Sequence, residues 1–166
     1  MPAAATNQTI GRLEIASSRS PDGDVITLKG QLDDQATLSE LLDQIGTHVI
    51  IDLGGIRFIN SVGVREWIVF LGALVERGTK VVLRKCSEPM VHQMNMVVEA
   101  GAGAEIESFH APYVCSGCGS EQSVALVVAP IRDQLKARTV PTQPCPDCGD
   151  TMRFDDFPNR YLLFLD

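Results

Sequence analysis

Apolar residues recur along residues 11–110 in two alternating patterns, short β-type runs and helical three- and four-residue spacing. Strand-like runs that alternate with helical stretches predict a layered α/β domain with a largely parallel or mixed sheet. A turn signal, SPDGD, separates the first two predicted strands, and a glycine pair breaks the run VIIDL from IRFI. In chain order, the predicted strands are RLEIAS, DVITLKG, VIIDL with IRFI, GTKVVLRKC and AEIESFH.

Three helices are predicted between these strands. The first lies within QLDDQATLSELLDQIG, and the third within EPMVHQMNMVVEAGAG, where glycines end it. The second begins next to Ser61, and Gly78 lies where its C-terminal stop is expected. The apolar face of the first helix consists of Leu38, Leu41, Leu42 and Ile45. That of the second consists of Val64, Trp67, Ile68, Leu71, Leu74 and Val75.

Ser61 lies where a predicted strand is followed by a predicted helix, at or next to the N-cap. Its hydroxyl can accept a hydrogen bond from a free amide of the first turn. A phosphate attached there would face the positive end of the helix dipole, so the position could carry added negative charge without melting the helix. Two interpretations remain open from this window: Ser61 is only a helix cap, or it is a phosphorylation switch.

The segment IDLGGIRFINSVGVREW, residues 51–67, resembles the signature of the STAS domains. These domains comprise the anti-sigma factor antagonists and the cytoplasmic ends of sulphate transporters. The resemblance implies that Asp52 is the strand-end acid, Ser61 the phosphorylated residue and Gly63 the signature glycine. Asn60 stands where the family usually has Asp, so the resemblance implies the fold more directly than the phosphorylation. The partner-binding residues that it implies are Asn60, Ser61, Val62, Gly63 and Arg65.

Four of the five cysteines form two CxxC pairs, each followed by glycine, in CSGCG (115–119) and CPDCG (145–149). Two such turns can direct four thiolates at one point, which predicts a tetrahedral zinc site. Four thiolates leave no open position for substrate, so we expect the metal to be structural. An iron site, a redox-active dithiol and disulfides are the alternatives. The expected ligands are Cys115, Cys118, Cys145 and Cys148.

Residues 112–166 resemble the zinc-ribbon class on the evidence of these two turns and their flanking runs. VALVV is expected to be a strand, IRDQLKA a short helix, and TMRFDD and RYLLFL a hairpin across FPN. The predicted organisation is a flexible tail over 1–10, a STAS-like domain over 11–111 and a zinc-ribbon-like domain over 112–166. Because no flexible linker separates the domains, we expect a short, fairly rigid connection.

Composition and charge exclude several classes of function. The net charge is −7, and neither half of the chain has the cluster of basic residues that nucleic-acid binding needs. Arg132, Lys136 and Arg138 form a small basic group that fits a solvated helix face better. No apolar run approaches the roughly 20 residues of a membrane span. The start of the chain does not resemble a signal peptide, which favours a cytoplasmic protein over a disulfide-bonded one. A nucleophile, base and orienting group are not recognisable together, so we expect no enzyme.

The sequence therefore predicts a non-enzymatic signalling module. In the terms of the resembling family, its partner would be an anti-sigma factor with serine kinase activity or a signalling scaffold, and phosphorylation of Ser61 would release that partner. A homodimer is also possible. Two alternatives stay open: a constitutive scaffold without phosphorylation control, and a regulator whose cysteines release zinc on oxidation.

Overall fold

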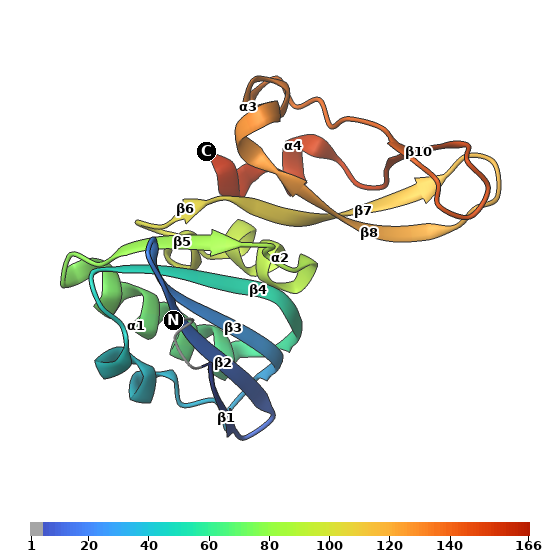
Figure 1. Cartoon of the computed structure of the whole chain (residues 1–166). Helices are drawn as coiled ribbons and strands as arrows, with labels where there is room; N and C mark the ends of the chain where they lie inside the picture. Colours follow the sequence, from blue (N-terminus) through green and yellow to red (C-terminus); the bar gives the residue numbers. More distant parts are fainter. Residues whose placement is uncertain (1–4) are drawn as a thin grey trace.

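The computed structural model describes residues 5–166, which form two β-sheets with helices packed against them (Figure 1). The first sheet has six strands in sequence order; β1, β2 and β3 are antiparallel, whereas β3 to β6 are parallel. This confirms the expected mixed sheet. Its strands are β1 (Thr6–Ile10), β2 (Leu13–Ser20), β3 (Gly23–Leu32), β4 (His48–Ile59), β5 (Lys80–Arg84) and β6 (Glu105–Ile106).

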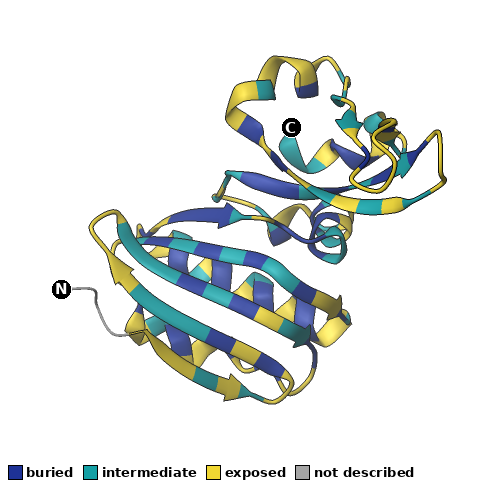
Figure 2. Cartoon of the chain, turned by 45° about the vertical axis from the view of Figure 1, so that its right-hand side comes forward, coloured by how far each residue is buried: buried dark blue, intermediate teal, exposed yellow. Residues whose placement is uncertain are grey.

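Helices pack on one face of this sheet and bury their apolar sides against it (Figure 2). The predicted spacing in the second helix is confirmed, because Trp67, Leu71 and Leu74 are fully buried. The indole Nε1 of Trp67 donates to the carbonyl of Ala100 over 2.8 Å and so ties α1 to η2. These elements are the 3₁₀ helix η1 (Leu38–Gln44), α1 (Ser61–Glu76), α2 (Glu88–Met96) and the 3₁₀ helix η2 (Val98–Ala100).

The second sheet is antiparallel and has the order β8, β7, β10, β9. It extends away from the first sheet, as the yellow and orange strands of Figure 1 show. Three short helical segments cover its inner end. The strands are β7 (Ser108–Cys115), β8 (Glu121–Val127), β9 (Gln143–Pro144) and β10 (Thr151–Phe154), and the helical segments are α3 (Val128–Lys136), α4 (Pro158–Tyr161) and η3 (Leu163–Leu165).

Direct contacts join the two sheets into one continuous core. The backbone of Cys86, just after β5, bridges to Phe109 in β7, and Glu107 is the one residue between β6 and β7. The side chain of Asn95 donates to the carbonyl of Tyr161 over 2.9 Å and accepts from the amide of Phe164 over 2.8 Å. The two parts are therefore joined by backbone pairing and by a partly buried polar side chain.

Several expectations about the first sheet need correction. Residues 6–10 are not a flexible tail: they pair with β2 through a tight turn at Gly11, whose φ of +61° suits glycine. Residues 1–4 of the expected tail lie outside the described part of the chain. The glycines at 54 and 55 do not end the strand, because β4 continues to Ile59 with register irregularities against β3. The first predicted helix is a 3₁₀ helix.

The C-terminal part also differs from expectation. β7 runs through the predicted boundary between residues 111 and 112, so the second sheet begins at Ser108, and only Glu105–Ile106 of the predicted strand AEIESFH joins the first sheet. The predicted hairpin across FPN is wrong, since residues 158–165 are helical. Pro158 lies in the first turn of α4, where its missing amide costs nothing. The expected strand VALVV and helix IRDQLKA correspond to β8 and α3.

Candidate functional site

Ser61 is the first residue of α1, and one residue separates it from the end of β4. The residue that caps the helix is Asn60, whose Oδ1 accepts a hydrogen bond from the amide of Gly63 over 2.8 Å. The side chain of Ser61 is exposed, and its hydroxyl forms no hydrogen bond with any residue from 5 to 166. The interpretation of Ser61 as the helix cap is therefore wrong. Its hydroxyl forms no hydrogen bond that would stabilise the fold of residues 5–166.

Gly63 lies in the first turn of α1 against the end of β3. A Cβ atom at this position would collide with the carbonyl oxygen of Leu32, and also approach the amide of Asp33. The amide of Asn60 donates to the same Leu32 carbonyl over 3.1 Å, and Leu32 is the register partner of Ile59. Glycine is therefore required at position 63, because the first turn of α1 packs closely against the end of β3.

Asp33 is a residue that our sequence reasoning missed. It follows β3 directly and is 1% exposed, with Oδ1 accepting from the amide of Gln35 over 3.0 Å. Its other oxygen lies 3.4 Å from Nη1 of Arg12. Because β3 and β4 are parallel and end side by side, this carboxylate lies at the same sheet edge as Asn60. The available signal was an acid three residues after the predicted strand DVITLKG, which the structure extends to Leu32.

Asp52, which the family resemblance implies at a strand end, lies in the middle of β4. Its Oδ1 accepts from the amide of Gly54 over 2.9 Å, and its Oδ2 is 3.8 Å from Nζ of Lys85. The structure therefore does not bring Asp52 together with Ser61. The strand extends beyond the glycine pair, so Asp33 and not Asp52 is the acid near the start of α1.

The exposed side chains around Ser61 are partly apolar. Val62, Arg65 and Val69 share one face of α1 at three- and four-residue spacing, and Val69 is 62% exposed. We call Ser61, Val62, Arg65 and Val69 the α1 surface. Of the predicted partner-binding residues, Asn60 caps the helix and Gly63 is packed against the end of β3. The other three, Ser61, Val62 and Arg65, are exposed.

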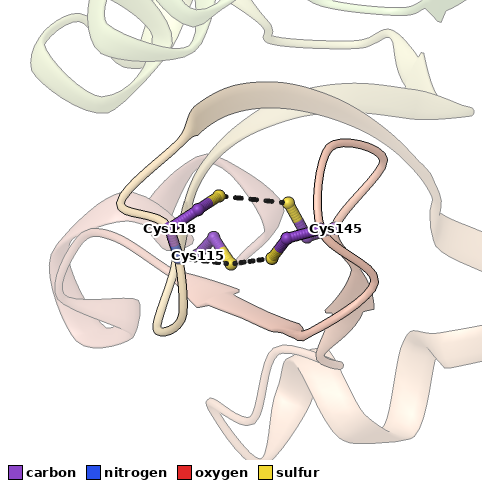
Figure 3. Close-up of side chains that lie close together, drawn as sticks. Cys115, Cys118 and Cys145 are labelled. Atoms are coloured by element: carbon purple, nitrogen blue, oxygen red, sulfur yellow. Dashed lines mark hydrogen bonds between the residues drawn. The ribbon is translucent and has the colours of Figure 1, made fainter.

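The four cysteines lie in the turns of two neighbouring hairpins, one between β7 and β8 and one between β9 and β10 (Figure 3). Both turns have the same backbone pattern. The amide of Cys115 donates to Ser120 and its carbonyl accepts from Gly119; Cys145 makes the matching pair of bonds with Asp150 and Gly149. Both glycines have positive φ, 75° and 80°. The pairing of β10 with β7 places the two turns side by side.

The four sulfur atoms form one cluster, with all ligand atoms within 4.8 Å of one another. The Sγ atoms of Cys115 and Cys148 are 3.4 Å apart, and those of Cys118 and Cys145 are 3.7 Å apart. A dashed line joins the latter pair in Figure 3. A tetrahedral zinc ion with bonds of about 2.3 Å needs sulfurs about 3.8 Å apart. The cluster thus has the size and the donor set of a four-thiolate metal site.

Backbone amides favour a thiolate at Cys115. The amides of Cys118 and Gly117 donate to its sulfur over 3.5 Å and 3.3 Å. Together with hydrogen bonds from the thiols of Cys148 and Cys145, they lower the pKa of the Cys115 thiol to about 7. The amide of Asp150 lowers the pKa of the Cys148 thiol, but the neighbouring thiols, Cys115 first among them, have the opposite and larger effect. The net result is a pKa raised to about 12. Four adjacent thiolates therefore repel one another unless a cation lies between them.

None of the helices formed by residues 5–166 combines the length and the apolar character needed to cross a bilayer.

The fifth cysteine, Cys86, is fully buried in the core and lies outside the cluster. Burial raises the pKa of its thiol to about 12, so it is an unreactive core residue.

Neither a protein-family profile nor a curated protein sequence matches this chain. Among solved structures, the chain is similar to the anti-sigma factor antagonist SpoIIAA in its unphosphorylated form, with 17% sequence identity and a TM-score of 0.40. The similarity covers 62% of this chain and 87% of that one.

Proposed function

We propose that this chain is a non-enzymatic regulatory module of the STAS type, which binds another protein through the α1 surface and releases it when Ser61 is phosphorylated. The observation that carries the proposal is the free, exposed hydroxyl of Ser61 at the first position of α1. Because Asn60 already caps the helix, modification of Ser61 sacrifices no native hydrogen bond. The STAS-type signature of residues 51–67 supports the same assignment.

The charge at this position explains how such a switch would work. A phosphoserine carries a charge of about −1.5 to −2 at pH 7. Beside the positive end of the α1 dipole this charge stabilises the helix, so the fold tolerates it. A partner seated on Val62 and Val69 would instead have to desolvate it. We therefore propose an anti-sigma factor with serine kinase activity as the partner, acting in the cytoplasm.

Asp33 supports this proposal despite the Asn at position 60. A carboxylate still lies at the sheet edge where α1 begins, although it comes from the residue after β3 and not from the residue before Ser61. Its distance from Arg12, 3.4 Å, shows a partial compensation of its charge. An acid near the acceptor serine is thus present in the folded chain even though the signature dipeptide lacks it.

We propose that the cysteine cluster holds a structural Zn²⁺ ion. Cys115, Cys118, Cys145 and Cys148 would be its ligands, with no position left for a substrate. The ion would supply charge that stabilises all four thiolates and would hold the two hairpin turns together. The second sheet would then be a rigid extension that adds a surface to the first.

Partner capture tests the switch. Wild-type, Ser61→Ala and Ser61→Asp chains would be used as baits in lysate of the native host, with Ser39→Asp as the matched control, because Ser39 is exposed on the neighbouring η1. We expect one partner to bind wild type, Ser61→Ala and Ser39→Asp but not Ser61→Asp. Phosphorylation of Ser61 by that partner with ATP would be read by mass spectrometry. Loss of the partner with Ser39→Asp as well would contradict a site-specific switch.

Identical partner sets for all four baits would instead favour the constitutive scaffold. A second outcome, zinc release under mild peroxide with a coupled change in partner binding, would favour the redox-sensing regulator. The exposed sulfurs of Cys118 and Cys148 are the observation that keeps this candidate open, because an oxidant can reach them.

A further inference from the structure

A cavity of about 520 Å³ opens between the β6 end of the first sheet and the helical segments α3 and η3. It is formed by the η2 to β6 segment on one side and by residues 128–138 and 163–166 on the other. Its volume is within the range of small-molecule sites, about 300 to 1,000 Å³. Neither the α1 surface nor the cysteine cluster contributes to it.

Apolar side chains form part of the wall of this cavity, beside several charged ones. Met94 and Leu135 are buried in its wall, and Phe164 packs against the core beside them. Val98, 79% exposed, and Leu163 continue the apolar surface to the rim. Exposed apolar side chains that border a partly apolar hollow favour an occupant with an apolar body.

The charged groups of the lining are unequally paired. Arg138 is neutralised, because its Nη2 lies 2.7 Å from both carboxylate oxygens of Asp166. Arg132 and Lys136 lie one turn apart on α3, and neither forms an ion pair with any residue from 5 to 166. Glu105 of β6 is the remaining acid of the lining. The mouth thus has two free cations against one free carboxylate, in a chain whose net charge is −7.

We propose that this cavity binds a small amphiphilic carboxylate. Its apolar tail would lie against Met94, Leu135 and Phe164, and its carboxylate would lie between Arg132 and Lys136. The apolar wall supplies affinity through burial, and the two cations select an anionic head over a neutral or cationic one. This inference is independent of the proposed switch at Ser61.

Titration of the full chain with decanoate below its micelle concentration tests the proposal, with calorimetry for affinity and amide NMR for location. We expect saturable binding and amide shifts confined to residues 94–106, 128–138 and 163–166. Replacing both cations (Arg132→Gln with Lys136→Gln) should weaken decanoate binding about tenfold, the scale of two exposed charges. Glu105→Gln should strengthen it. Arg153→Gln, an exposed cation on β10 outside the cavity, should leave it unchanged.

Three results would overturn the inference. The first is the absence of saturable decanoate binding to the wild-type chain. The second is equal affinity of decanoate for the wild type and the double variant, or equal affinity of decanoate and the neutral decanol for the wild type, because either would remove the role of the cations. The third is binding that persists in Ala102→Trp, which places a large side chain at the exposed alanine of the rim. An acidic peptide that binds where decanoate does not would assign the cavity to a protein partner instead.

Discussion

The carbonyl oxygen of Leu32 occupies the space that a side chain at Gly63 would need. This relationship fixes the start of α1 against the end of β3, and with it the position of Ser61 at the edge of the sheet. Elsewhere in the same helix the opposite situation occurs, since a Cβ atom at Gly72 would meet nothing within 4 Å. Within α1, close packing therefore requires glycine at position 63 but not at position 72.

Gly63→Ala should destabilise the fold by about 1 to 3 kcal/mol, because the backbone of β3 or α1 must shift to admit the methyl group. Gly72→Ala is the matched control and should stabilise the chain by about 0.5 to 1 kcal/mol, since alanine is the better helix former. Urea unfolding of both variants measures the difference. Equal effects of the two substitutions would contradict the close approach at Leu32.

Asn60→Ala should cost about 1 kcal/mol of unfolding free energy, because the amide of Gly63 loses its capping partner. Asn60→Asp should keep the cap, and the added charge should favour the helix start by a few tenths of a kcal/mol. Ser61→Ala should leave stability nearly unchanged. Thermal unfolding of the three variants is the measurement, and a loss with Ser61→Ala as large as that with Asn60→Ala would mean that Ser61 has a capping role.

If the cysteine cluster holds the proposed Zn²⁺ ion, removal of that ion should unfold the outer half of the second sheet and leave the first sheet intact. The two cysteine turns are held by few apolar side chains, so the ion should supply much of their stability. Hydrogen exchange after chelation should show lost protection in β9, β10 and the outer part of β7 and β8, with retained protection in β3 to β5. Elemental analysis of the purified chain identifies the metal.

Cys115→Ser should reproduce the effect of chelation, because three thiolates and a hydroxyl hold zinc less well. Cys86→Ala is the control: Cys86 lies in the core outside the cluster, so this variant should retain the full metal content even if it is less stable. Protection that survives chelation in the outer turns would show that their folding is independent of metal.

Asn95→Ala should loosen the connection between the two sheets. Both ends of its side-chain amide are satisfied by backbone groups of the C-terminal segment, and its loss leaves those groups in a partly buried site at a cost of about 1 to 3 kcal/mol. Asn159→Ala, at an exposed position of α4, should change stability by less than about 0.5 kcal/mol. Faster hydrogen exchange in α4 and η3 of the first variant alone is the expected observation.

Local patterns were sufficient for much of the architecture. The helical spacing of Trp67, Leu71 and Leu74 predicted the buried face of α1, and the CxxC pairs predicted a cluster of four sulfurs. Both predictions succeed because the period of an element and the reach of a short turn are properties of consecutive residues. The alternation of strands and helices likewise predicted the mixed sheet.

Tertiary structure decided the features that depend on distant segments. Thr6–Ile10 is a strand only because β2 offers it a partner, and residues 158–165 are helical against α2 where their apolar run favoured a strand. The role of Asn60 as the cap, the exclusion of Asp52 from the Ser61 site and the burial of Asp33 all follow from where β3 and β4 end relative to each other. The sequence by itself determined the kinds of element and the two CxxC turns whose sulfurs cluster, because each of these arises from neighbouring residues. The surroundings of Ser61 and the cavity beneath α3 are set by contacts between remote parts of the chain, which no local pattern encodes.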